Sequence, residues 1–389
     1  MSDKIEKAFT KLSYYCEKEA YKGYDPYDGL NSTFFKSIPF LSKNRLFRLI
    51  WIQTFKRSPL NLRPLTGVSK GYNPKALGLF LSGYCNLYRV KPDNEYLDKI
   101  NFFTGKLTEL QNKNWSGACW GYNFDWQARA FFQPENTPTV VATTFISSAL
   151  LDAYEITHNE ELLALARSSC NFILKDLNRT ADEKGNIAFS YSPLDSSVVY
   201  NASLLGSRLL ARVYAITREG ELYDAARKSV AFCSSRQDAD GSWSYGFQSF
   251  HKWIDNFHTG YNLECISDYM KYTGDNQFSE NLEKGLSYYL ENFFTVEGIP
   301  KYYNNSLYPI DIHCSSQLII TLSRLGIFDR YRNVADKIIN WTIDNMQSDK
   351  GYFYYQITKY FSSRIPYMRW AQAWMFYALS EYLLRLKKV

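Results

Sequence analysis

Two kinds of helix-length segment alternate along the chain, and they differ in how their apolar residues are distributed. In one kind, such as residues 198–217, apolar and small residues fall on most sides, which is typical of a helix buried all around. In the other kind, such as residues 220–235, charged and apolar residues alternate at helical spacing, which is typical of a helix with one exposed face. The alternation predicts repeated pairs of one inner and one outer helix.

The buried kind occurs six times, and the amphipathic kind occurs five times after the first buried segment. The predicted inner helices lie near residues 75–90, 139–157, 198–217, 257–273, 312–325 and 367–386. The predicted outer helices lie near residues 94–112, 160–177, 220–235, 277–294 and 328–347. The last inner helix lacks a following partner. A helix predicted near 43–57 is left over, and we expect it to supply the sixth outer position.

A short glycine-led aromatic segment follows each of the five outer helices. These segments begin 53 to 68 residues apart, at Gly117, Gly185, Gly241, Gly298 and Gly351. A near-constant period is the sequence signature of a repeat architecture. Each segment predicts a turn followed by a short β-like stretch.

These repeats predict an all-α fold, an (α/α)6 toroid in which six inner and six outer helices close into one ring. The alternative is an open array of helical hairpins, which needs polar caps at both ends. The final segment, 367–386, is among the most apolar and aromatic of the chain, which favours closure. We expect residues 1–42 to form an N-terminal extension and residues 43–389 a single toroid domain.

Composition narrows the class of protein. The chain of 389 residues has a net charge of +6, and 17% of its residues are aromatic. Its content of 46% hydrophobic and 22% charged residues excludes a wholly disordered chain. Its Lys and Arg residues form no long run, so nucleic-acid binding is not expected. The seven cysteines are scattered and predict neither a disulfide framework nor a zinc site. No signal-peptide core and no run of 18 apolar residues is present, which predicts a cytoplasmic protein without a transmembrane segment.

Several segments resemble known toroid proteins. Gln237 to Trp243 matches the Q-x-x-x-G-x-W core of the QW repeat of terpene cyclases. The layout of residues 75–386 is similar to the six-hairpin toroids of glycoside hydrolases, polysaccharide lyases and sugar epimerases. Segments 254–260, 308–313 and 369–374 resemble toroid proteins encoded with enzymes of bacterial surface-polysaccharide biosynthesis. The QW-like motif is interpreted as structural, and Trp243 is kept as a candidate substrate-binding residue.

Two of the four histidines fall at places that look equivalent, at the start of predicted inner helices. His258 follows Asp255 by three residues, and His313 follows Asp311 by two. Because the loops that enter the inner helices of a toroid line one mouth of its cavity, we predict both histidines to act there as general acid or base. The alternative is that both are hydrogen-bonded inside the ring. The two aspartates are interpreted either as catalytic carboxylates, compatible with an inverting glycosidase pair, or as helix N-caps.

Further polar residues are predicted to bind the substrate at the same mouth. Asn262 and Gln317 lie four residues after the two histidines and therefore on the same helix faces. Arg369 has the matching place on the last inner helix, and Arg364 and Tyr367 precede it. Guanidinium groups bind carboxylates in bidentate fashion, so these residues favour an anionic saccharide.

A second cluster lies between the first aromatic turn and the second inner helix. Asp125, Trp126 and Arg129 combine a stacking surface with a carboxylate and a guanidinium, as a sugar site does. The alternative is a structural salt bridge beside a buried Trp. Tyr245 and Tyr302, in the later turns, are candidate catalytic residues for a uronate lyase or epimerase.

Motifs that would indicate other chemistry are absent. The chain has no D-x-D-D-like cluster for terpene cyclisation, no G-x-x-x-x-G-K-[ST] or G-x-G-x-x-G, no G-x-S-x-G and no H-E-x-x-H. No cofactor or metal is therefore predicted. The sequence indicates a carbohydrate-active protein of bacterial polysaccharide biosynthesis, as a glycoside hydrolase, lyase or epimerase. A non-catalytic saccharide-binding or scaffold protein is the alternative, and the charged mouth counts against terpenoid or lipid binding.

Overall fold

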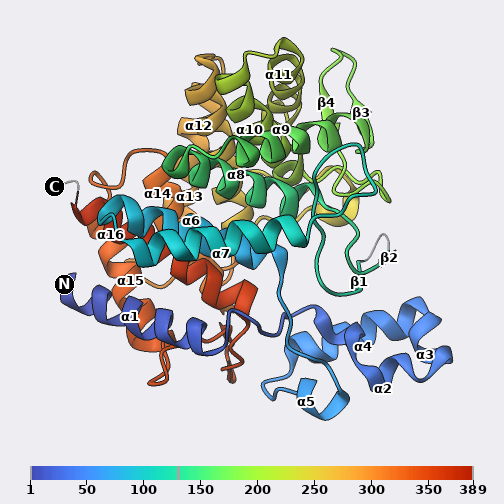
Figure 1. Ribbon diagram of the computed structural model, residues 1–389, viewed down its shortest axis with the longest axis vertical. Helices are drawn as coiled ribbons and strands as arrows, with labels where there is room; N and C mark the ends of the chain where they lie inside the picture. The colour runs from blue at the N-terminus through green and yellow to red at the C-terminus, as the bar shows by residue number, and fades with distance from the viewer. Residues whose placement is uncertain (1, 129–131, 388–389) are drawn as a thin grey trace.

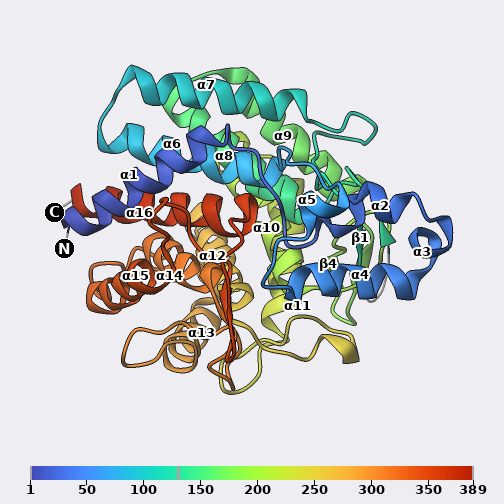
Figure 2. The ribbon, with the colours of Figure 1, turned by 90° about the horizontal axis from the view of Figure 1, so that it is seen from below.

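Six inner helices follow one another around a closed ring in the computed structural model, which describes residues 2–128 and 132–387. They are Pro74–Val90 (α6), Val140–Thr157 (α8), Tyr200–Thr217 (α10), Asn256–Thr273 (α12), Ile312–Arg324 (α14) and Trp374–Lys387 (α16). A π-helical segment, Met368–Ala373 (η3), leads into α16. Each helix packs against the next, and α16 packs against both α14 and α6, so the ring is closed (Figure 2). The (α/α)6 toroid predicted from the repeats is confirmed.

Six outer helices surround this ring (Figure 2). They are Ser2–Lys18 (α1), Asn94–Glu109 (α7), Glu160–Lys175 (α9), Gly220–Ser234 (α11), Ser279–Asn292 (α13) and Arg332–Met346 (α15). The sixth position, beside α16, belongs to α1. The prediction that the helix near 43–57 fills this position is therefore wrong.

The N-terminal helix α1 joins the ring through one apolar stripe. Ile5, Phe9, Leu12 and Cys16 follow one another at helical spacing and are all buried in the main core. At the end of α15, the side-chain amide of Gln347 donates to the backbone carbonyl of Ala8 in α1. The division of the chain at residue 42 stays a prediction, although α1 packs as a ring helix.

The helix expected at the sixth outer position lies instead in an inserted segment between α1 and α6. This segment, residues 25–72, contains Asp28–Asn31 (η1), Thr33–Lys36 (α2), Pro39–Lys43 (α3), Arg45–Arg57 (α4) and Arg63–Thr66 (α5). Figure 1 shows these helices set apart from the ring. One attachment is the buried Arg63, which forms an ion pair with Asp28 at 2.5 Å and donates to the hydroxyl of Tyr367.

The strands are short, and they lie in the loops between helix pairs. Trp126–Gln127 (β1) pairs antiparallel with Phe132–Gln133 (β2), and Arg179–Ala181 (β3) pairs antiparallel with Ile187–Phe189 (β4). The third sheet consists of Ile310–Asp311 (β5), Gln356–Ile357 (β6) and Ser362–Ser363 (β7), all antiparallel. Of the strands described, only β4 lies within a predicted aromatic segment, the one that begins at Gly185. The segments that begin at Gly117, Gly298 and Gly351 contain isolated β-bridges instead, at Cys119, Pro300 and Phe353.

The aromatic turns fix the N-terminal ends of the inner helices. The first backbone N–H of an inner segment donates to the carbonyl oxygen of an aromatic residue in the following turn, and this bond recurs around the ring. The five pairs are Val140 to Tyr191, Tyr200 to Tyr245, Asn256 to Tyr302, Ile312 to Tyr355 and Met368 to Tyr24. The fifth pair identifies the segment around Tyr24 as a sixth turn, which the sequence analysis missed. These bonds hold the helix ends together at one mouth.

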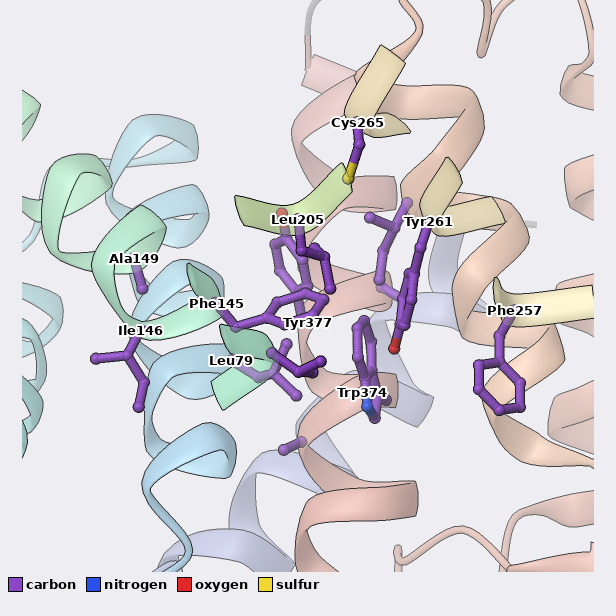
Figure 3. Close-up of a cluster of buried hydrophobic side chains, with 14 of the residues drawn as sticks. Leu79, Phe145, Ile146, Ala149, Leu205, Phe257, Tyr261, Cys265, Trp374 and Tyr377 are labelled. Carbon is purple, nitrogen blue, oxygen red and sulfur yellow. The ribbon is translucent and has the colours of Figure 1, made fainter. Parts of the chain in front are cut away.

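Apolar and aromatic side chains fill the centre of the ring. Figure 3 shows Tyr261 of α12 beside Trp374 of α16, and their rings stack with centroids 5.7 Å apart. All seven cysteines are buried and unpaired. Within the described part of the chain, no helix has the length and apolar character needed to cross a membrane.

Candidate functional site at the mouth of the ring

A cavity of about 400 Å³ opens where the inner helices begin. The second residue of every inner segment lines it, which places six repeats around one space: Lys75, Val141, Asn201, Phe257, His313 and Arg369. Because the inner helices start here, the positive ends of their dipoles lie around the cavity.

Aromatic turns and the inserted segment build the upper walls. The turns contribute Tyr122, Tyr191, Tyr245, Trp253 and Tyr302, and the insertion contributes Tyr27, Leu49, Gln53, Lys56 and Arg57. Trp126, from the β1–β2 hairpin, lines the same space. Flat aromatic faces beside polar groups suit the binding of a ring with hydroxyl substituents.

His258 is held by Asp255 and faces the cavity. The Nδ1 of His258 lies 2.7 Å from Oδ2 of Asp255, and the backbone N–H of His258 donates to Oδ1 of Asp255. Asp255 is thus an N-cap of α12, as one of the two predictions has it, and it also orients the imidazole. In the neutral imidazole, this bond favours the tautomer with the proton on Nδ1 and the lone pair on Nε2. Nε2 has no hydrogen-bond partner in the residues the structure describes.

His313 lies deeper than His258. It is the second residue of α14, whereas His258 is the third residue of α12, so the two are not at equivalent positions as predicted. The ring of His313 stacks on Phe257 with centroids 4.3 Å apart, and its Nε2 lies 2.9 Å from the hydroxyl of Tyr261. Burial, and then the charge of Lys75, lowers the pKa of His313 well below its usual range, so this imidazole is neutral.

Asp311 caps α14 beneath the cavity. Its Oδ1 accepts hydrogen bonds from the backbone N–H of His313 and the indole N–H of Trp370, and its Oδ2 accepts from the side-chain amide of Gln356. Burial raises the pKa of Asp311 to about 6, although these hydrogen bonds act in the opposite direction. Neither Asp311 nor Asp255 lines the cavity. The proposed pairing of the two as glycosidase carboxylates stays untested, but both are engaged by protein donors.

Arg369 lines the cavity but has a partner within the protein. Its Nε and Nη2 lie 2.5 and 2.8 Å from the carboxylate of Asp25, a bidentate pair with both residues buried. Burial opposes the charge of Arg369, but Asp25 outweighs it and raises the pKa of the guanidinium. Asp25 therefore occupies the guanidinium group that was expected to bind a substrate carboxylate. The sequence analysis missed Asp25.

The two predicted amide residues lie inside the ring and not at the mouth. Gln317 donates to Thr321 at 2.9 Å and to Glu264, whose pKa burial raises to about 7. Asn262 is buried and also absent from the cavity lining. Their place four residues after the histidines puts them one turn further into the helix bundle, which explains why they face the ring interior.

The predicted aromatic residues divide between the cavity and the core. Trp126, Tyr245 and Tyr302 line the cavity, and Tyr245 stacks on Trp253 with centroids 4.5 Å apart. Trp243 does not: its indole N–H donates to the carbonyl of Cys233 and its ring is buried. The structural interpretation of the QW-like motif fits this placement better than substrate binding.

Three further predicted binding residues, Asp125, Tyr367 and Arg364, do not line the cavity. Asp125 forms an ion pair with Lys36 of the insertion at 3.3 Å, the structural alternative for this residue. Tyr367 accepts a hydrogen bond from Arg63, and Arg364 lies over the ring of Tyr354. Arg129 lies outside the described residues, so its prediction stands as it was made.

Sequence reasoning missed three groups of the cavity. Lys75 carries a weak signal, since it directly follows the Asn-Pro pair at the start of the first inner helix. Tyr261 lies three residues after His258, one helical turn away, and could have been found from that spacing. The residues of α4 give no such signal, because an insertion breaks the repeat that locates the others.

The described lining residues include Lys56, Arg57, Lys75 and Arg369 but no Asp or Glu. The cavity is therefore cationic, and the helix N-termini add to its positive field. No group of three His, Cys, Asp or Glu within residues 2–128 and 132–387 is arranged to hold a metal ion.

No family model and none of the curated proteins matches the chain. Solved structures do match. The cellobiose 2-epimerase of Bacillus thermoamylovorans B4167 is 14% identical over 81% of this chain and 88% of its own, with a TM-score of 0.65. An unsaturated glucuronyl hydrolase specific for heparin is 14% identical over 100% of this chain and 97% of its own, with a TM-score of 0.64. A family 76 α-mannanase of Bacteroides thetaiotaomicron is 14% identical over 82% and 89%, with a TM-score of 0.62. At such identities the likeness establishes the toroid fold.

Proposed function

We propose that this chain is a carbohydrate-processing enzyme in which His258 transfers a proton on a saccharide bound at the mouth of the ring. The observation that carries the proposal is the Asp255–His258 pair, whose imidazole faces an aromatic-lined cavity with Nε2 free. A neutral histidine held in one tautomer is a general base suited to neutral pH. The rings of Tyr245 and Trp253 beside it provide faces on which a sugar can stack.

The lining favours epimerisation, isomerisation or elimination over hydrolysis. Glycoside hydrolases commonly use two carboxyl groups that flank the glycosidic bond. The described lining residues contain no carboxylate, and Asp255 and Asp311 accept hydrogen bonds from the protein. Removing a proton from a carbon next to a carbonyl or carboxyl group needs a positioned base, a proton donor and a group that stabilises the negative charge on the oxygen. A cellobiose 2-epimerase among the structural neighbours is consistent with such chemistry.

A second proton-transfer group lies near His258. The hydroxyl of Tyr261 lines the cavity and is hydrogen-bonded to His313, which is neutral. With His258 as base, we propose Tyr261 as the group that returns a proton to the sugar, a role that its hydrogen bond to His313 supports. Tyr245 and Tyr302 are further donors in the wall. The role in bacterial surface-polysaccharide production is part of this proposal and depends on the sequence resemblance. The cytoplasmic location is also part of it and depends on the sequence pattern.

The proposal predicts that His258→Gln abolishes proton transfer on the bound sugar. The protein is incubated in D₂O with reducing disaccharides, aldoses and uronic acids, and loss of the proton signal next to the carbonyl or carboxyl group is followed by NMR. We expect exchange by the wild-type protein and a fall of about 100-fold or more in the variant, the usual range for a general base.

The matched control is His158→Gln, which changes an exposed histidine at the end of α8. It should leave exchange unchanged. Wild-type exchange by His258→Gln would overturn the assignment of His258. Saturable binding of a saccharide by the wild-type protein without exchange or product would overturn the enzyme and support the saccharide-binding alternative.

A further inference from the structure

Lys75 lies at the floor of the cavity with only 3% of its surface exposed. It is the second residue of α6, whose first residue is Pro74 and whose N-cap is Asn73. Its ammonium nitrogen lies 4.3, 5.2 and 5.6 Å from the ring centroids of Phe145, Trp374 and Tyr261. Three aromatic rings thus surround the side-chain nitrogen of Lys75.

This ammonium group has no anionic partner in the described part of the chain. No hydrogen bond and no ion pair joins the side-chain nitrogen of Lys75 to another described residue. The nearby guanidiniums are already paired, Arg369 with Asp25 and Arg208 with Glu264. Burying an unpaired charge is unfavourable by several kcal/mol, so a buried lysine normally has a partner or loses its proton.

The pKa of Lys75 reflects this isolation. Burial lowers it well below the usual range for a lysine, and the charge of Arg369 acts in the same direction. Asp25 opposes the effect but is bound to Arg369. A negative group placed beside Lys75 would remove the cause of the shift and favour the charged ammonium.

The surroundings of Lys75 also suit a negative group. The second residues of α8, α10, α12 and α14 line the same cavity, so the positive ends of four further helix dipoles lie around it. No Asp or Glu among the described lining residues competes for the ammonium group. The Nδ1 atom of His313, in the same wall, is buried without a hydrogen-bond partner in the described chain.

We propose that Lys75 binds an anionic substituent, a carboxylate or a phosphate, of the saccharide that occupies the cavity. The proposal rests on the proposed function for the saccharide, and it moves the recognition of the negative charge from Arg369 to Lys75. The ligand supplies the negative half of an ion pair and thereby favours the charged form of the Lys75 amine. Because the site is apolar on three sides, the pair forms in a low dielectric, where the attraction is stronger than in water.

The test compares ligands that differ only in charge. Binding of glucuronate, glucose 6-phosphate and glucose is measured by titration calorimetry for the wild-type protein and for Lys75→Met. We expect the wild type to bind at least one of the anionic sugars about tenfold or more tightly than glucose. The two anions separate a carboxylate site from a phosphate site. Lys75→Met should lose this preference while its affinity for glucose stays within about twofold.

Two controls keep the outcome interpretable. Lys228→Met changes an exposed lysine of α11 and should keep the preference for the anion. Met has a similar volume and no charge to bury, so the Lys75→Met protein should melt no lower than wild type without ligand. The anionic sugar should raise the melting temperature of the wild type and not that of the variant. An equal preference in wild type and Lys75→Met, or no preference in wild type, would overturn the proposal.

This test can be separated from that of the proposed function. Binding is measured without turnover, and His258→Gln should keep the preference for the anion because it leaves Lys75 in place. Loss of the preference only in Lys75→Met supports the anion site even when His258 proves dispensable for exchange. Exchange that depends on His258 without any discrimination between charged and neutral sugars would overturn the role of Lys75 alone.

Discussion

The carboxyl group of Asp311 is fully buried under the cavity, where it caps α14 and accepts the indole N–H of Trp370. Its environment differs from that of Asp25, which forms a bidentate pair with Arg369. Hydrogen bonds without a contacting cation do not offset burial, so the pKa of Asp311 rises to about 6. In the unfolded chain the same group titrates near 4. The difference links the stability of the protein to pH.

We predict that the titration of Asp311 lowers the free energy of unfolding as pH rises from about 4 to about 6. Within this window the folded protein holds a proton that the unfolded chain has released, so the free energy of unfolding falls with rising pH. A shift of about two units corresponds to roughly 3 kcal/mol across the window. Asp311→Asn keeps the shape of the side chain and removes its ionisable group. The amide of Gln356 can turn so that its oxygen accepts a hydrogen bond from the new side chain.

Urea unfolding of the wild type and Asp311→Asn between pH 4 and 7 measures this contribution. Asp28 and Glu264, whose pKa values burial raises to about 6 and about 7, add a background of the same sign in both proteins. The difference between the two stability curves should therefore isolate Asp311. Curves that run parallel over the window would show that Asp311 does not titrate in this way.

At the level of elements, the aromatic turns depend on glycine for two separate reasons. Gly185 and Gly351 both have positive φ, at 75° and 96°, a region that other residues enter only with strain. At Gly185 a Cβ atom would meet nothing within 4 Å. At Gly351 it would lie 2.2 Å from the backbone carbonyl oxygen of Lys11 in α1. This turn is therefore pressed against the helix that completes the outer layer.

We predict that Gly351→Ala destabilises the protein clearly more than Gly185→Ala. Gly185→Ala serves as the control, because it introduces backbone strain alone, about 1–2 kcal/mol. Gly351→Ala adds a clash with backbone that cannot move without shifting α1, so we expect at least twice that loss. Denaturant unfolding of both variants measures the difference. Equal losses would mean that the contact between the turn and α1 is not tight.

The same elements show how far the sequence determines the fold and the site. The inner helices were predictable because burial on all sides leaves long apolar segments, and the glycine turns gave their period. The helix α1 was missed as a ring helix because the inserted segment separates it from α6, so the repeat is broken. Asp25 was missed for the same reason: it lies 344 residues from Arg369, and no local pattern reports such a pair. His258 was found because its helix start is part of the repeat.

At the scale of the whole molecule, the ring closes between the two ends of the chain. The inner helix α16 packs against α6 on one side and α14 on the other, and α1 covers it from outside (Figure 2). The bond from Met368 to the carbonyl of Tyr24 and the Asp25–Arg369 pair connect the same two regions. Because both lie at the cavity mouth, the shape of the site depends on this closure.

Closure by α1 makes a prediction that an unattached N-terminal extension would not. Leu12 is fully buried in the core, and Leu12→Ala should lower the free energy of unfolding by about 2–5 kcal/mol through lost burial and the cavity it leaves. The control, Leu65→Ala in the inserted segment, removes a side chain that is 84% exposed and should change stability by less than about 0.5 kcal/mol. Denaturant unfolding monitored by circular dichroism measures both. If α1 were a detachable extension, Leu12→Ala would leave the main transition in place, as the control does, and the ring would have to close without it.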